Sequence, residues 1–219
     1  MALFGLIAEG NSDLAVLENI LIGLFEEDIS DEIETLQPDR GATYEHSAKA
    51  HGGWYKVFEY CRSDDFEGAF DRIKYLVVQI DTDVSEEKHY DIKKTDDNGR
   101  KLLPEEIVER VKDKFLLIIE NAFGQDFLTN YRDRIIFAIS VDEIECWLLP
   151  LFYSNNTKGL TRNCDFNLHQ KAGKFAKKYN DYDKVSEKYR DFKTMKKAYP
   201  MNPSLKIFVE SILAKNITT

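Results

Sequence analysis

Short runs of apolar residues, separated by stretches with helical spacing, set the pattern of this chain. Residues 3–8, 73–80 and 134–141 are nearly continuous apolar runs, which is typical of strands that are buried on both faces. Residues 33–36 form a weaker run that ends before Pro38. The pattern therefore predicts four strands.

Apolar positions that recur every three or four residues predict helices between these strands. After the first strand, Asn11 or Ser12 is expected to cap an apolar helix. A second helix is expected to begin at Trp54 and to fray near residues 63–65. A third is expected at Pro104, because proline is favoured in the first turn and two acids follow it.

The alternation of strands and helices indicates an α/β fold with a mainly parallel β-sheet and helices on both faces. Beyond residue 155 we expect helices alone, near residues 168–179, 184–197 and 204–215. We therefore divide the chain into an α/β domain, residues 1–155, and a basic helical C-terminal extension, residues 156–219, packed on it.

Two polar stretches are expected to be loops. The first, residues 41–53, contains two histidines, His46 and His51, and a pair of glycines. The second, residues 84–103, is longer than ordinary connections, so we expect a functional role or partial disorder there.

The composition limits the class of protein. With 219 residues, of which 43% are hydrophobic and 32% charged, the chain can build a core, which excludes a wholly disordered chain, a collagen or a disulfide-stapled mini-protein. No apolar run approaches the roughly 20 residues of a membrane-spanning helix, so no membrane contact is expected. The apolar start of the chain lacks a basic flank, so a signal peptide is not expected either.

The net charge of -9 hides a basic region. Residues 156–197 contain twelve Lys and Arg against five Asp and Glu. Such a region can bind a polyanion, although an ordinary solvated helical surface explains it equally well. The three cysteines, Cys61, Cys146 and Cys164, show no metal-ligand spacing, so we expect reduced thiols and a cytoplasmic protein.

Acidic residues follow three of the predicted strands. Glu9 and Asp13 follow the first strand, Asp81 and Asp83 follow the third, and three acids follow the fourth. The three are Asp142, Glu143 and Glu145. Because the carboxyl ends of parallel strands meet at one edge of a sheet, we expect these side chains to gather there.

Carboxylates that gather in this way repel one another unless a cation compensates them. Mg²⁺ and Mn²⁺ prefer such oxygen ligands, and phosphate esters are their common substrates. The alternative is that some of these acids only cap the next helix, which applies most to Asp13, Asp142 and Glu143. This alternative fits Asp81 and Asp83 less well, since a long loop follows them.

Two of these segments resemble the Toprim domain. One is Ile7-Ala8-Glu9-Gly10-Asn11-Ser12-Asp13 followed by an apolar helix, and the other is the strand that ends in Asp81-Thr82-Asp83. Type IA and type II topoisomerases, bacterial primases and the overcoming-lysogenisation-defect nucleases share this domain. The resemblance covers roughly residues 1–155 and implies that Glu9 is a catalytic acid/base or metal ligand and that Asp81 and Asp83 bind Mg²⁺. Asp13 matches the place where the nuclease branch often has a second acid.

The segment Val141-Asp142-Glu143-Ile144-Glu145-Cys146-Trp147-Leu148-Leu149 is similar to one in small standalone Toprim-like proteins of bacterial phage-defence and abortive-infection loci. From these resemblances we expect a Mg²⁺- or Mn²⁺-dependent nuclease acting on DNA or RNA. Its metal ligands are expected to be Glu9, Asp13, Asp81, Asp83, Glu143 and Glu145. Lys171 or Lys174 is expected to neutralise the charge that develops in the reaction, and the basic tail to bind the nucleic acid.

A second hypothesis stays open from the sequence. The site can hold a metal or a nucleotide without turnover, and the chain can serve a separate ATPase as its binding or regulatory partner. Neither a phosphate-binding glycine loop nor a dinucleotide motif is present in the chain. The sequence does not choose between DNA and RNA, and it does not indicate the oligomeric state.

Overall fold

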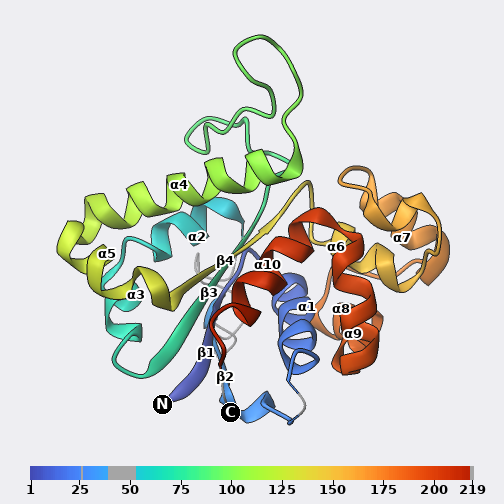
Figure 1. Cartoon of the computed structure of the whole chain (residues 1–219), viewed down its shortest axis with the longest axis horizontal. Helices are drawn as coiled ribbons and strands as arrows, with labels where there is room; N and C mark the ends of the chain where they lie inside the picture. The colour runs from blue at the N-terminus through green and yellow to red at the C-terminus, as the bar shows by residue number, and fades with distance from the viewer. Residues whose placement is uncertain (26, 39–52, 218–219) are drawn as a thin grey trace.

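The computed structural model describes residues 1–25, 27–38 and 53–217. Its sheet has four strands: β1 (Ala2–Ile7), β2 (Ile33–Gln37), β3 (Ile73–Asp81) and β4 (Ile135–Ser140). They pair in the order β2-β1-β3-β4 and all run parallel (Figure 1). The prediction of an α/β fold with a parallel sheet is therefore confirmed.

Alternate residues of the central strands face two separate cores. Leu6 of β1, Val77 of β3 and Ile136 of β4 lie side by side and face one core. Their neighbours Ile7 and Val78 face the other. Both sets are fully or almost fully buried, which explains why these strands show no polar alternation in the sequence.

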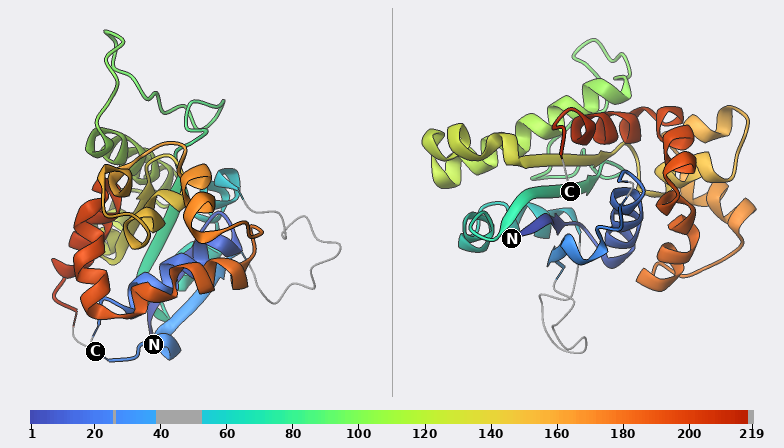
Figure 2. Two further views of the ribbon diagram at one scale, coloured as in Figure 1. Left: turned by 90° about the vertical axis from the view of Figure 1, so that its right-hand side faces the viewer. Right: turned by 60° about the horizontal axis from the view of Figure 1, so that its bottom comes forward.

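Helices cover both faces of the sheet, as predicted (Figure 2). One face packs against α2 (Trp54–Tyr60), α3 (Asp64–Ala69), α4 (Pro104–Phe123) and α5 (Gln125–Tyr131). The other packs against α1 (Asn11–Ile22) and the C-terminal helices. Those are α6 (Glu145–Leu148), α7 (Cys164–Ala172), α8 (Tyr179–Ser186), α9 (Phe192–Ala198) and α10 (Pro203–Leu213).

The C-terminal extension shares its core with the α/β part. The Trp147 indole N–H donates to Ser204 Oγ at 2.8 Å, and its ring stacks on Phe208 at 5.3 Å between centroids. Asn19 of α1 donates to Ser186 Oγ of α8 at 2.7 Å. The extension therefore completes one face of the sheet, which is consistent with the expectation that it packs on residues 1–155.

The helix boundaries within the extension differ from the prediction. The helix expected over residues 168–179 ends at Ala172, where Gly173 has a φ of 82°, and residues 173–178 are not helical. The helix expected over residues 184–197 is interrupted after Ser186. There a 3₁₀ turn, η6 (Glu187–Arg190), precedes Asp191, whose side chain caps α9.

Two further elements were not expected. Residues 63–65 do not fray, because the Ser63 side chain accepts a hydrogen bond from the Phe66 amide and begins α3. Gly124, with a φ of 85°, separates α4 from a second helix, α5. Each of these helix boundaries depends on one capping residue, Ser63 or Gly124, and hydrophobic spacing does not reveal it.

Of the first predicted loop, residues 41–53, all but Gly53 lie outside the described residues, and with them His46 and His51. The second forms a long connection between β3 and α4, as expected (Figure 1). A bridge between Thr95 and Lys101 folds it back on itself, and Tyr90 is fully buried at its base. Within the described residues, no helix has the length and apolar character needed to cross a membrane.

The expectation of reduced thiols is wrong for two of the three cysteines. Cys146 of α6 and Cys164 of α7 form a disulfide, with their Cα atoms 4.9 Å apart, whereas Cys61 is free and buried. The two partners are 18 residues apart in the sequence. Only the packing of α7 against α6 brings them together.

Candidate functional site

Acidic side chains from three parts of the chain line one cavity at the carboxyl edge of the sheet. The cavity has a volume of about 250 Å³, and we call it the acidic pocket. The charged residues that line it are Glu9, Asp13, Asp81, Asp83, Glu145 and Lys177. The structure therefore brings together five of the six predicted metal ligands with one lysine.

Hydrogen bonds to residues of β3 fix the position of Glu9. One carboxylate oxygen of Glu9 accepts a hydrogen bond from the Asp81 amide at 2.7 Å. The Glu9 amide donates to Oε1 of Gln79 at 3.1 Å, and Nε2 of Gln79 donates to Asp81 Oδ1 at 2.9 Å. Gln79 is fully buried. Its signal in the sequence is a polar residue near the end of the apolar run of β3, directly before Ile80 and Asp81, and the hydrophobic pattern alone does not single it out.

Asp13 lies in the first turn of α1, directly beside the acids of the strand ends. It is almost fully buried, and the charge of Glu145 acts on it. A Cβ atom added at Gly10 would lie 3.1 Å from Asp13 Oδ2, so the backbone passes close to this carboxylate. The turn after β1 therefore holds Glu9 and Asp13 against the same cavity.

Glu145 enters the acidic pocket from α6, and only 1% of its surface is exposed. Its Oε1 atom accepts hydrogen bonds from the hydroxyl of Tyr182 and from Lys177 Nζ, the latter at 3.0 Å. Its Oε2 atom is buried and, within the described part of the chain, has no hydrogen-bond partner. An unsatisfied carboxylate oxygen is costly to bury, which makes it a candidate ligand.

Burial and mutual repulsion raise the pKa values of three pocket acids, Glu9, Asp13 and Asp81. Burial, followed by the charge of Asp13, raises the pKa of Glu9 to about 8. Burial, followed by the charge of Glu145, raises the pKa of Asp13 to about 7. Burial also raises the pKa of Asp81 well above its ordinary value, with Asp13 and Glu9 adding to the effect. The pocket is therefore short of positive charge and favours either protons or a cation.

The lysine in the acidic pocket is Lys177, whereas Lys171 and Lys174 are exposed and do not line it. Lys171 instead lies over the ring of Tyr153 at 5.5 Å. Lys177 follows the break at Gly173, and the non-helical segment directs it back toward Glu145. Hydrophobic spacing predicts one helix for all of these lysines, so it does not distinguish Lys177 from the others.

Glu143 lies beside the acidic pocket but does not line it. One of its carboxylate oxygens accepts a hydrogen bond from the Asp165 amide at 2.6 Å, in the first turn of α7. Burial raises the pKa of Glu143 to about 7. This contact resembles the capping role that we left open for Glu143 in the sequence.

Asp142 fixes the loop that carries Asp83. Its carbonyl accepts hydrogen bonds from the amides of Thr82 and Asp83 at 2.9 and 2.8 Å, and its own amide donates to Thr82 Oγ1 at 2.9 Å. The φ of Asp142 is 73°, in the left-handed region that non-glycine residues rarely adopt. This turn joins the ends of β3 and β4.

The spacing of possible ligand atoms bears on how a metal would bind. Within the described residues, one group of three has its ligand atoms within 4.8 Å of one another, namely Asp142, Cys146 and Cys164. The disulfide occupies both sulfur atoms, so this group does not fit a metal. Among the described residues, no three acids of the acidic pocket have their ligand atoms this close together.

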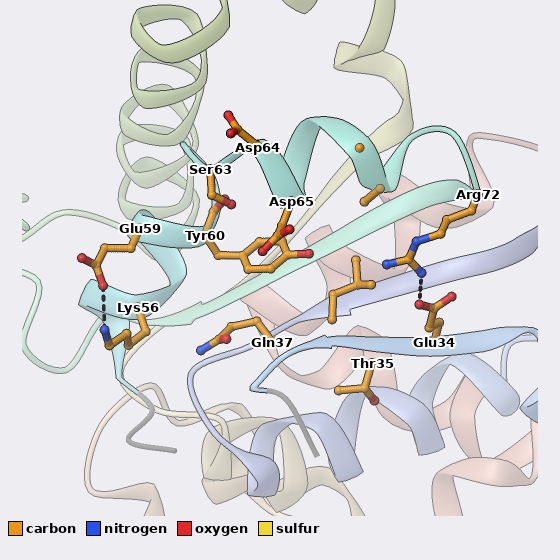
Figure 3. Close-up of a pocket in the computed structure, with 13 residues that line it drawn as sticks. Glu34, Thr35, Gln37, Lys56, Glu59, Tyr60, Ser63, Asp64, Asp65 and Arg72 are labelled. Atoms are coloured by element: carbon orange, nitrogen blue, oxygen red, sulfur yellow. Dashed lines mark hydrogen bonds and ion pairs between the residues drawn. The ribbon is translucent and has the colours of Figure 1, made fainter. Parts of the chain in front are cut away.

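A larger cavity, of about 570 Å³, lies between β2 and the helices α2 and α3 (Figure 3). It contains two ion pairs, Lys56 with Glu59 at 2.8 Å and Arg72 with Glu34. Two more acids from the start of α3 also line it. Its cations are already paired and its net charge is negative, so it is poorly suited to a phosphate group.

No family model, curated protein or solved structure matches this chain.

Proposed function

We propose that this protein is a Mg²⁺- or Mn²⁺-dependent nuclease of Toprim type, which hydrolyses phosphodiester bonds in DNA or RNA. The observation that carries the proposal is the acidic pocket, where five carboxylates face one cavity at the carboxyl edge of a parallel sheet. The donor set fits a hard divalent cation, since every acidic ligand is an oxygen and Glu145 Oε2 is buried without a partner.

The residues of the pocket suggest separate roles. Asp13, Asp81, Asp83 and Glu145 would hold the cation, which when bound would polarise the phosphate and acidify a water molecule. Glu9, with a pKa raised to about 8, is suited to take up and release a proton near neutral pH. Lys177 takes the role first expected of Lys171 or Lys174, since its ammonium group faces the pocket.

We propose nucleic acid as the partner of the C-terminal extension. Its lysines, including Lys178, Lys184 and Lys193, are exposed, as phosphate binding requires. Tyr182 and Tyr189 are fully buried, so they pack in the core and cannot stack on bases. Binding through this surface is therefore expected to depend on charge and on salt.

The proposed location is the cytoplasm, where a nucleic-acid substrate is present, and a role in phage defence would fit it. The disulfide counts against this location, because cytosolic thiols are normally kept reduced. In the cytoplasm, Cys146 and Cys164 would therefore be expected to exist largely as free thiols.

The alternative is a binding or regulatory partner of a separate ATPase, with an inactive site. One observation favours it: among the described residues, no three of the pocket carboxylates have their ligand atoms within 4.8 Å of one another. In that case the protein would bind a cation weakly or not at all.

Cleavage of supercoiled plasmid and of tRNA in the presence of Mn²⁺ tests the proposal. Glu9→Gln is expected to lower the cleavage rate by about a hundredfold or more, because the amide cannot transfer the proton, and to leave substrate binding intact. Asp81→Asn is expected to abolish Mn²⁺ binding in calorimetry. The exposed Glu120 on α4 provides the matched control, and Glu120→Gln should change neither result.

An unchanged Mn²⁺ affinity in Asp81→Asn would show that the site is assigned wrongly. If the wild-type protein binds Mn²⁺ but cleaves neither substrate, the alternative of a binding partner is supported instead. If Glu9→Gln cleaves normally and only its melting temperature changes, Glu9 has a structural role.

A further inference from the structure

A second cavity lies on the other side of the segment that carries Asp81 and Asp83. Its volume is about 470 Å³, and we call it the basic pocket. The long loop, the start of α4, the end of β4 and the segment before α7 form its walls. Thr82 and Asp142 line it, while Asp83 lines the acidic pocket, so one turn of backbone separates the two cavities.

Contacts across this turn join the two pockets. Lys94 of the basic pocket donates from Nζ to the carbonyl oxygen of Asp83 at 2.6 Å. Asp142 accepts from the amides of both Thr82 and Asp83. A chain of phosphates that crosses the carboxyl edge of the sheet would therefore meet both cavities in succession.

Positive charge prevails among the charged residues that line the basic pocket. Lys94, Lys101 and Arg162 line it, against two acids, Glu86 and Asp142. The Thr95–Lys101 bridge and the bond from the Leu102 amide to the Lys94 carbonyl, at 2.9 Å, fix the arm that carries both lysines. The hydroxyls of Thr95 and Thr161 add neutral polar groups. This composition suits a phosphate group.

Apolar residues also line the basic pocket. Leu102, Pro104, Ile107 and Val141 line it, and three of these are largely buried against the core. The volume lies within the range of small-molecule sites, about 300–1,000 Å³. A lining that combines apolar residues with cations matches a molecule with a flat ring system and an anionic group, whereas a free phosphate would use only the cations.

We propose that the basic pocket binds one nucleotide of the nucleic-acid strand, with its phosphate at Lys101 and Arg162 and its base against Leu102 and Ile107. The neighbouring phosphodiester then lies in the acidic pocket. This inference rests on the proposed function for the strand, but the binding of the nucleotide itself requires neither metal nor catalysis. If the nucleotide binds there, the long loop, residues 84–103, forms part of the substrate site.

Calorimetric titration with adenosine monophosphate, inorganic phosphate and adenosine, all in EDTA, tests this proposal. The mononucleotide is expected to bind at least tenfold more tightly than phosphate or the nucleoside, because it uses both the cations and the apolar residues of the pocket. Lys101→Ala and Arg162→Ala are each expected to weaken its binding about tenfold, the loss of one charge-assisted hydrogen bond. Lys88→Ala is the matched control, since Lys88 is exposed in the same loop but does not line the pocket.

Two results would overturn the proposal. In one, phosphate binds as tightly as the mononucleotide, which would show that the pocket is only an anion-binding site. In the other, Lys101→Ala and Arg162→Ala bind the mononucleotide as the wild-type protein does. Cleavage separates this proposal from the proposed function: cleavage without mononucleotide binding refutes the basic pocket alone, and mononucleotide binding without cleavage or Mn²⁺ binding refutes the nuclease alone.

Discussion

Raising the pH in the absence of divalent cations is expected to destabilise this protein. The reason is the raised pKa of three acids in the acidic pocket, Glu9, Asp13 and Asp81. At a pH below about 4, these acids are protonated in both the folded and the unfolded chain, so they do not affect stability. Between their ordinary pKa and the raised one, the unfolded chain releases protons that the folded chain keeps, so stability falls as the pH rises. The loss from Asp13 is nearly complete at about pH 8, while the loss from Glu9 continues above that pH.

The size of the loss follows from Asp13. Its pKa rises from 3.8 to about 7, and each pH unit corresponds to about 1.4 kcal/mol, which gives about 4 kcal/mol between pH 4 and pH 8. The rise for Glu9 is similar. However, the two acids share their mutual repulsion, so the contributions do not add. For a chain of this length, about 4 kcal/mol corresponds to a fall in melting temperature of roughly 10 °C.

Thermal and urea unfolding in EDTA, at pH values from 4 to 9, measure this effect. Asp81→Asn is the informative variant, because it removes one charge from the pocket and should flatten the fall. His169 also has a raised pKa, caused chiefly by a backbone hydrogen bond at Asp165, and acts in the same direction. It is unchanged in the variant, so the difference between the two proteins reports the pocket.

Adding Mn²⁺ at pH 8 should restore stability to the wild-type protein and not to Asp81→Asn. At a hundred times the dissociation constant, the expected gain is about 2.7 kcal/mol. A stability that is flat or rises between pH 5 and pH 8 in EDTA would refute the reasoning. So would an equally steep fall in Asp81→Asn.

Two further predictions concern the packing of the C-terminal helices. A Cβ atom at Gly23 would lie 1.6 Å from the carbonyl oxygen of Tyr189, so Gly23→Ala should cost about 3 kcal/mol in urea unfolding; Gly68→Ala in α3 meets no atom within 4 Å and should be neutral or slightly stabilising. Reduction of the Cys146–Cys164 disulfide should cost about 3 kcal/mol, and a reductant that leaves the melting temperature unchanged would contradict this contribution.

The sequence by itself determined the sheet and the place of the acids. Buried parallel strands must be apolar on both faces, so the runs that became β1, β3 and β4 are visible without any partner. Once the strands are known to be parallel, Glu9 and Asp81 must end at the same edge. This is why five of the six predicted ligands lie around one cavity.

Only the tertiary structure decided which residues complete the site. Lys177 and Tyr182 contact Glu145 because Gly173 ends α7 and the chain turns back, and one glycine within a charged segment does not show this in the sequence. The basic pocket likewise combines a loop, a helix start and a segment far along the chain. Periodicity reports how one segment meets the core, whereas such contacts depend on where separate segments meet in space.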